Sequence, residues 1–228
     1  MLQELAPDLF TASLPLRFLG LAFGVRTTIL RLPDSSLWVH SPIPLSPELR
    51  AAVETLGPVR HLVAPNLLHH RWIADWATAF PEARVFGSAA LARKRKDLTF
   101  HGVLSDTPDP DWGGALVPVS MAGMDRQQET QFLHPASETL ISADLVLALP
   151  PDLDHWWTNT YARLNGAHGK AAACTFVHKT VVTDRKTARA SLDRLLDAPF
   201  SRLVVSHREV LVGSSVPDAL REAWSWLR

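Results

Sequence analysis

The sequence is poor in cysteine and has no surplus of either charge. Its one cysteine, Cys174, excludes an internal disulfide and any metal site built from several thiolates. Lys and Arg together number 23, as do Asp and Glu, so no basic surplus favours nucleic acid or an anionic membrane as a partner. We therefore expect a small-molecule substrate, and any bound metal must take histidine and carboxylate ligands.

Long apolar runs are also missing, although 46% of the 228 residues are hydrophobic, ample for a sizeable core. No run approaches the roughly 20 residues of a membrane-spanning helix, and the N-terminus lacks the pattern of a secretory signal. We expect a soluble, cytoplasmic protein. No repeat or low-complexity linker divides the chain, which predicts one domain over residues 1–228.

The order of the predicted elements indicates an α/β protein. Segments rich in β-branched and aromatic residues, separated by turn residues, predict strands over 9–14, 25–32 and 37–40. The chain then alternates between helix and strand over 46–56, 59–64, 71–80, 83–86 and 88–94. Strands follow over 116–121, 129–134, 138–148 and 202–206, and helices over 152–164, 186–196 and 216–227. This pattern predicts two β-rich halves with helices outside.

Four histidines and one aspartate stand at the ends of predicted strands: His40, His69, His70, Asp144 and His207. Strands hold such positions in place while the loops after them let side chains converge. A single histidine in such a place is usually a hydrogen-bonded structural residue. The recurrence at equivalent places favours a shared site.

Three segments that contain these residues resemble motifs of the metallo-β-lactamase superfamily. They are 64–70 (APNLLHH), 132–144 (FLHPASETLISAD) and 204–207 (VVSH). The resemblance covers nearly the whole chain and is closer to an uncharacterised branch, a domain of unknown function. It implies an αββα sandwich of two mixed β-sheets with helices on the outside, and one or two zinc or iron ions at one rim.

The resemblance also implies a reduced metal site. The superfamily motif His-x-His-x-Asp-His, aligned on His70, places Pro65 and Leu67 at two histidine positions and His69 at the aspartate. Asp125 falls near the third ligand of the first metal position. The implied mononuclear ligands are His69, His70, Asp144 and His207. The alternative is that His69 packs at the start of the next helix and only His70 faces the pocket.

Three imidazoles and one carboxylate suit one zinc ion, and also iron or manganese. The expected function is metal-dependent hydrolysis of a small ester, thioester or phosphodiester, with His40 or Asp125 as a proton carrier or ligand orienter. Two alternatives stay open. Mononuclear iron would indicate an oxidoreductase, and a site without metal would indicate a non-catalytic, ligand-binding relic of the fold.

The predicted helix over 152–164 has an aromatic face with Trp156, Trp157 and Tyr161. It follows Asp144 closely, so these rings either line an apolar wall of the pocket or pack in the core as in any amphipathic helix. His178 is a further pocket candidate without an assigned role.

Overall fold

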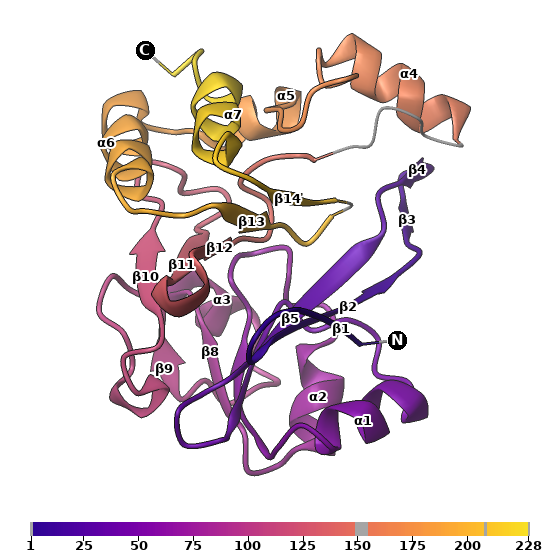
Figure 1. Cartoon of the computed structure of the whole chain (residues 1–228), viewed down its shortest axis with the longest axis vertical. Helices are drawn as coiled ribbons and strands as arrows, with labels where there is room; N and C mark the ends of the chain where they lie inside the picture. Colours follow the sequence, from indigo (N-terminus) through magenta and orange to yellow (C-terminus); the bar gives the residue numbers. More distant parts are fainter. Residues whose placement is uncertain (1, 149–154, 208, 228) are drawn as a thin grey trace.

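Two β-sheets form the centre of the computed structural model, which describes residues 2–148, 155–207 and 209–227 (Figure 1). The strands of the first sheet are β1 (Gln3–Ala6), β2 (Leu9–Leu14), β5 (Val25–Arg31), β6 (Leu37–His40), β7 (Val59–Val63), β8 (Arg84–Gly87) and β9 (Gly102–Val103). Those of the second are β10 (Val117–Ser120), β11 (Thr130–His134), β12 (Thr139–Ile141), β13 (Arg202–Val204) and β14 (Val210–Val212). A separate hairpin, β3 (Arg17–Phe18) and β4 (Leu21–Ala22), connects β2 to β5.

Both sheets are mixed. The spatial order is β1-β2-β5-β6-β7-β8-β9 in the first and β10-β11-β12-β13-β14 in the second. Strands β6 to β9 run parallel, as do β12 and β13, and the other neighbours are antiparallel. Because parallel neighbours end at the same edge of a sheet, the loops after β6 and β7 lie together, and so do those after β12 and β13.

Helices cover the outer faces of the sheets (Figure 1). The first sheet carries α1 (Pro47–Glu54), α2 (Ile73–Ala79) and α3 (Ala89–Lys94), and the second carries α6 (Arg185–Leu196) and α7 (Val216–Ala223). Serine side chains cap two of these helices: Ser46 Oγ accepts a hydrogen bond from Leu49 N, and Ser88 Oγ accepts one from Leu91 N. Two more helices, α4 (Trp156–Leu164) and α5 (Phe176–Val181), lie beyond the sheets, and α4 contacts β4.

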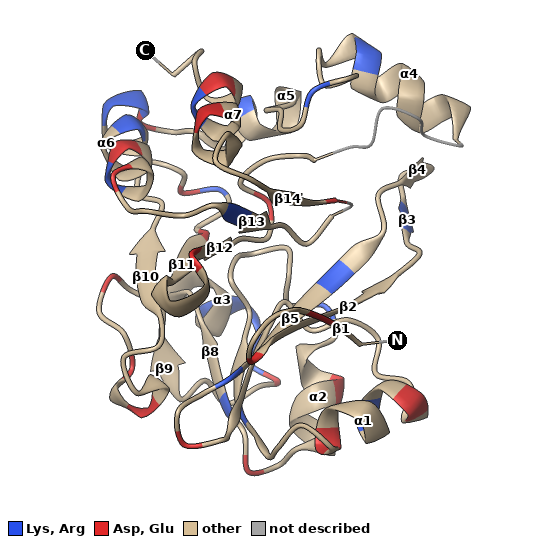
Figure 2. Cartoon of the chain, viewed as in Figure 1, with Lys and Arg blue, Asp and Glu red and all other residues tan. Residues whose placement is uncertain are grey.

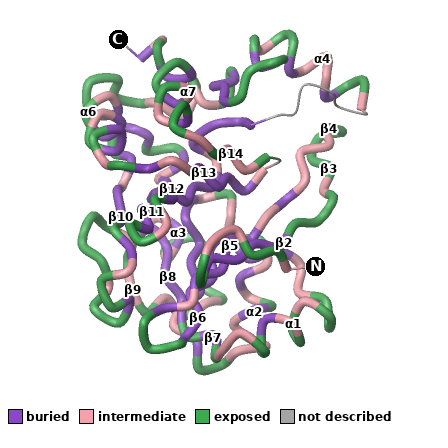
Figure 3. Tube along the Cα trace, viewed as in Figure 1, coloured by how far each residue is buried: buried purple, intermediate pink, exposed green. Residues whose placement is uncertain are grey.

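The core has three layers, which follow from the alternation of side chains along each strand. In β6, Leu37 and Val39 face the helices, while Trp38 and His40 face the second sheet. The rings of Trp38 and Phe132 pack edge-on across the two sheets, with centroids 4.9 Å apart. The buried strands run through the middle of the molecule in Figure 3. The layer order of helices, sheet, sheet and helices confirms the expected αββα sandwich.

Several predicted elements differ in extent, and the helix expected over 216–227 ends at Ala223. The strand expected over 138–148 ends at Ile141, because the backbone N–H groups of Ala143 and Asp144 turn toward a buried carboxylate described below. The helix expected over 152–164 begins at Trp156, and residues 152–154 lie outside the described part of the chain. Six short elements were not expected, because each is too brief to show a period in the sequence: β1, β3, β4, β9, β14 and α5.

Charged residues occur mainly on the outer helices and loops (Figure 2). In the part of the chain that the structure describes, no helix has the length and apolar character needed to cross a bilayer.

The buried His40 makes stability depend on pH. Burial lowers the pKa of His40 to about 3, and the nearby His69 adds to this effect. The folded protein therefore holds the ring neutral, while the unfolded chain binds a proton below about pH 6.5. Its contribution is full above that pH and is lost as the pH falls toward 3. The H40F variant cannot take up this proton. Between pH 7 and pH 5, its free energy of unfolding should therefore fall by about 2 kcal/mol less than that of the parent. Urea unfolding at both pH values measures this difference, and equal losses would show that His40 does not titrate as described.

Candidate metal centre

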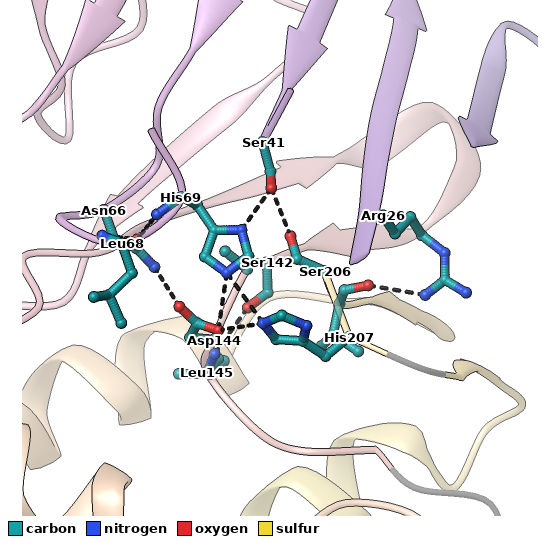
Figure 4. A network of polar contacts seen from close by, with 12 residues as sticks. Arg26, Ser41, Asn66, Leu68, His69, Ser142, Asp144, Leu145, Ser206 and His207 are labelled. Carbon is teal, nitrogen blue, oxygen red and sulfur yellow. Dashed lines mark hydrogen bonds and ion pairs between the residues drawn. The ribbon is translucent and has the colours of Figure 1, made fainter. Parts of the chain in front are cut away.

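Side chains from four strand ends converge at one rim of the sandwich (Figure 4). Ser41 follows β6, His69 lies in the loop after β7, Asp144 follows β12 and His207 follows β13. The parallel pairs β6–β7 and β12–β13 bring these ends together, one pair from each sheet. The rim therefore places histidine and carboxylate groups from both sheets opposite each other.

His69, Asp144 and His207 form a nearly equilateral triangle of ligand atoms. His69 Nε2 lies 3.1 Å from Asp144 Oδ1 and 3.2 Å from His207 Nε2, and His207 Nε2 lies 3.3 Å from Asp144 Oδ1. Among the described residues, this is the one group of three that meets the spacing of metal ligands. Tetrahedral coordination at about 2.0–2.1 Å places neighbouring ligand atoms about 3.3 Å apart, so the triangle fits three corners of such a site.

Hydrogen bonds to the outer nitrogens hold both rings with Nε2 toward the triangle. His207 Nδ1 donates to the carbonyl oxygen of Gly24 over 2.8 Å, which leaves the Nε2 lone pair free in the neutral ring. His69 Nδ1 lies 2.7 Å from Ser41 Oγ, which also accepts from Ser206 Oγ at 3.0 Å. Ser41 reaches this position with φ of 53°, a conformation uncommon outside glycine.

The electrostatics of the triangle favour a cation at its centre. Burial opposes a charge on Asp144, but His69 and His207 hold the pKa of Asp144 well below its ordinary value. Burial likewise works to lower the pKa of His207, yet the hydrogen bond and charge of Asp144 raise it overall. The three side chains thus direct one carboxylate oxygen and two ring nitrogens toward a common point. A proton or a metal ion at that point would balance the negative charge.

Asn66 donates a hydrogen bond to the second carboxylate oxygen of Asp144. Its Nδ2 donates to Asp144 Oδ2 at 2.9 Å and to Glu129 Oε2 at 3.1 Å, while its Oδ1 accepts from the backbone N–H groups of Leu68 and His69. The amide therefore both shapes the loop that carries His69 and holds the Asp144 carboxylate with Oδ1 toward the two imidazoles.

Glu129 lies beneath the site as a fully enclosed carboxylate, with 2% of its surface exposed. Its two oxygens accept hydrogen bonds from five groups: Asn66 Nδ2, Gln127 Nε2, Ser142 Oγ, Ala143 N and Asp144 N. Burial, and secondarily the charge of Asp144, raises the pKa of Glu129. These bonds tie the loop after β7 to the loop after β12.

The structure differs from the expected four-ligand set at His70. The two adjacent histidines point in different directions: His69 faces the triangle, whereas His70 Nδ1 lies 2.8 Å from Nη1 of Arg95, just after α3. Burial, together with the charges of Lys94 and Arg95, lowers the pKa of His70. The arrangement is also the reverse of the alternative in which only His70 faces the pocket.

The two residues expected to carry protons also lie outside the triangle. Asp125 is exposed and accepts a hydrogen bond from Thr183 Oγ1. The turn that carries it packs against the start of α6, where a Cβ on Gly123 would meet Asp184 O at 2.5 Å. His40 is buried between the sheets, where its ring stacks on Trp38 with centroids 5.5 Å apart. Neither residue lines the cavity beside the triangle.

That cavity has a volume of about 290 Å³ and opens beside His69, Asp144 and His207. His178 from α5 lines it, with Nδ1 accepting from the backbone N–H of Thr175 at 3.0 Å. Burial lowers the pKa of His178 to about 4. Tyr161 lines the cavity as well, whereas Trp156 and Trp157 do not, so one of the three aromatic residues considered in α4 is part of the wall.

Sequence reasoning missed Ser41, Asn66 and Glu129. Ser41 directly follows β6, and Asn66 lies three residues after the end of β7 and three before His69, in a loop region where polar side chains often organise the backbone. Glu129 gave no such signal, because it reads as the first residue of a predicted strand.

Comparisons with known proteins agree with this fold. Residues 13–90 match the model of a domain of unknown function, DUF4336. No curated protein matches the sequence. A metallo-β-lactamase from Pontibacter korlensis is 16% identical, with a TM-score of 0.69, over 100% of this chain and 98% of that one. The DIM-1 metallo-β-lactamase is 10% identical, with a TM-score of 0.68, over 100% and 98%.

The flavodiiron core of Flv1 from Synechocystis sp. PCC6803, studied after metal soaking, is 11% identical with a TM-score of 0.68, over 100% of this chain and 60% of that one. These likenesses show the fold, the αββα sandwich of the metallo-β-lactamases. They confirm the resemblance seen in the sequence.

The E129Q variant should be less stable by about 2–4 kcal/mol, because its amide would turn an N–H₂ group toward backbone N–H donors and leave buried groups unpaired. Urea unfolding measures the loss. The matched control is E54Q, which removes an exposed ion pair with Arg50 and should cost less than about 1 kcal/mol. Equal effects of the two substitutions would contradict the role given to Glu129.

Proposed function

From a metallo-β-lactamase fold that matches a domain of unknown function over residues 13–90, we propose that the protein is a metal-dependent hydrolase of a small molecule. The observation that carries the proposal is the triangle of His69 Nε2, Asp144 Oδ1 and His207 Nε2, with edges of 3.1–3.3 Å. Two imidazoles and one carboxylate are a ligand set that catalytic zinc uses in proteins, with a further position left open.

One divalent ion at this site would supply Lewis-acid chemistry, since it lowers the pKa of water toward neutrality and polarises a carbonyl or phosphoryl oxygen. The chain's own residues fix the geometry. Gly24 O and Ser41 Oγ keep the two rings turned with Nε2 inward, and Asn66 keeps Asp144 Oδ2 occupied. The mononuclear site proposed here therefore has three protein ligands rather than four.

The open side of the triangle faces the cavity of about 290 Å³. This size is near the lower end of small-molecule sites, which measure roughly 300–1,000 Å³. An ester, thioester or phosphodiester of modest size is the substrate we propose, since each presents an oxygen that a metal ion can polarise. The partner we propose for this cavity is therefore that small-molecule substrate.

A second candidate function rests on the same ligand set. Two histidines and one carboxylate with open positions also hold iron in mononuclear oxygenases. An iron oxidoreductase is therefore the alternative that the donors favour, and metal identity separates the two. A relic without metal would keep the cavity and bind no ion.

Metal content should follow the triangle and ignore His70. We expect about one metal ion per chain in protein purified without chelator, and a loss of 10-fold or more in metal affinity for H69A and H207A because each removes one of three ligands. H70A is the matched control and should keep the ion, since His70 faces Arg95. Plasma mass spectrometry and competition with a chromogenic chelator measure both quantities. Metal loss in H70A equal to that in H69A would remove the proposed ligand set.

Hydrolysis should require the bound ion. Dialysis against a chelator should abolish turnover of p-nitrophenyl esters or of bis(p-nitrophenyl) phosphate, and one equivalent of zinc should restore it. D144A should stay inactive at the same zinc concentration, because it lacks the anionic ligand. Activity that survives chelation, or that D144A retains, would overturn the hydrolase proposal. Restoration by ferrous iron alone, with consumption of oxygen, would favour the oxidoreductase.

A further inference from the structure

The cavity beside the triangle has apolar walls that come from separate parts of the chain. Phe23 and Tyr161 form one wall, where their rings meet edge-on with centroids 5.8 Å apart, and Phe23 also lies 5.9 Å from the ring of His207. Trp72 and Val181 of α5 also line the cavity. Apolar side chains thus make up much of the lining beside the ligand atoms.

Polar groups that line the cavity are partly engaged by the protein. Gln127 Nε2 donates to Glu129, and His178 Nδ1 accepts from Thr175 N. Arg71 is a cation at the cavity and is exposed, with its guanidinium 5.4 Å from the ring of Trp72. A ligand with many hydroxyl groups would leave most of them without partners against the apolar walls.

Apolar side chains also continue from the cavity to the surface. Phe18 on β3, Leu68 before α2 and Val177 on α5 all line the cavity, yet they are 56%, 61% and 51% exposed. The three come from segments far apart in the sequence. Figure 2 shows few charged residues on α4 and α5, in contrast to α6 and α7. An apolar rim of this kind at a cavity is typical of a ligand-binding mouth.

We propose that the cavity binds the apolar chain of a medium-chain monoacyl ester or thioester, with its carbonyl group toward His69, Asp144 and His207. The orientation of the carbonyl rests on the proposed hydrolytic function, whereas binding of the chain requires only the walls. The volume of about 290 Å³ limits the chain to medium length. Sugar derivatives are disfavoured, because their many hydroxyl groups have no partners on the apolar walls.

Equilibrium dialysis of the metal-free protein with radiolabelled octanoate tests the walls alone, with acetate as the ligand that has the same carboxylate and no chain. Octanoate should bind at least 100-fold more tightly than acetate. V177D on α5 should weaken octanoate binding at least tenfold, and so should F18S on β3. The matched control is V212D on β14, also an exposed valine (67%), which does not line the cavity and should leave binding unchanged. Circular dichroism and melting curves verify that each variant folds.

Equal binding of octanoate and acetate, or equal effects of V177D and V212D in folded protein, would overturn the inference. Its failure is separable from failure of the proposed function. Octanoate binding without hydrolysis of any p-nitrophenyl ester by the metal-loaded protein would support the inference and refute the hydrolase. Hydrolysis of acetyl and octanoyl esters with equal kcat/KM would support the hydrolase and refute the inference.

Discussion

The arrangement at the rim depends on one buried carboxylate, that of Glu129. An enclosed carboxylate is stable only where donors surround it, and here two loops supply them: Asn66 from the loop after β7, and the N–H groups of Ala143 and Asp144 after β12. Each sheet contributes one of these loops. Glu129 thereby joins the two sheets at the rim and sets the distance between His69 and Asp144.

Asn66 extends this network into the candidate metal centre. In the related superfamily motif, neighbouring positions carry histidines, but this chain has Pro65 and Leu67 there. The amide of Asn66 instead donates to Asp144 Oδ2, which leaves Oδ1 facing His69 and His207. The imidazoles that a second ion would need are missing from this loop. That loss of ligands favours the proposed mononuclear site.

Residue composition and the order of helices and strands predicted much of the scaffold. Leu37–His40 reads as a strand because it is rich in β-branched and aromatic residues and lies between turn residues. The sequence also indicated which strand ends carry His69, Asp144 and His207. It did not separate His69 from His70, since the direction of each ring depends on the turn made by Asn66 and on Arg95, a contact between distant segments. Glu129 was missed because its donors come together only in the folded chain.

X-ray absorption spectroscopy at the metal edge, on protein loaded with one equivalent of zinc, tests the central claim most directly. The site described here predicts a first shell with two imidazole nitrogens, one carboxylate oxygen and water oxygen. It also predicts no metal neighbour at about 3.5–4 Å. A third imidazole in the shell would contradict the ligand triangle, and a metal–metal distance in that range would contradict the mononuclear site.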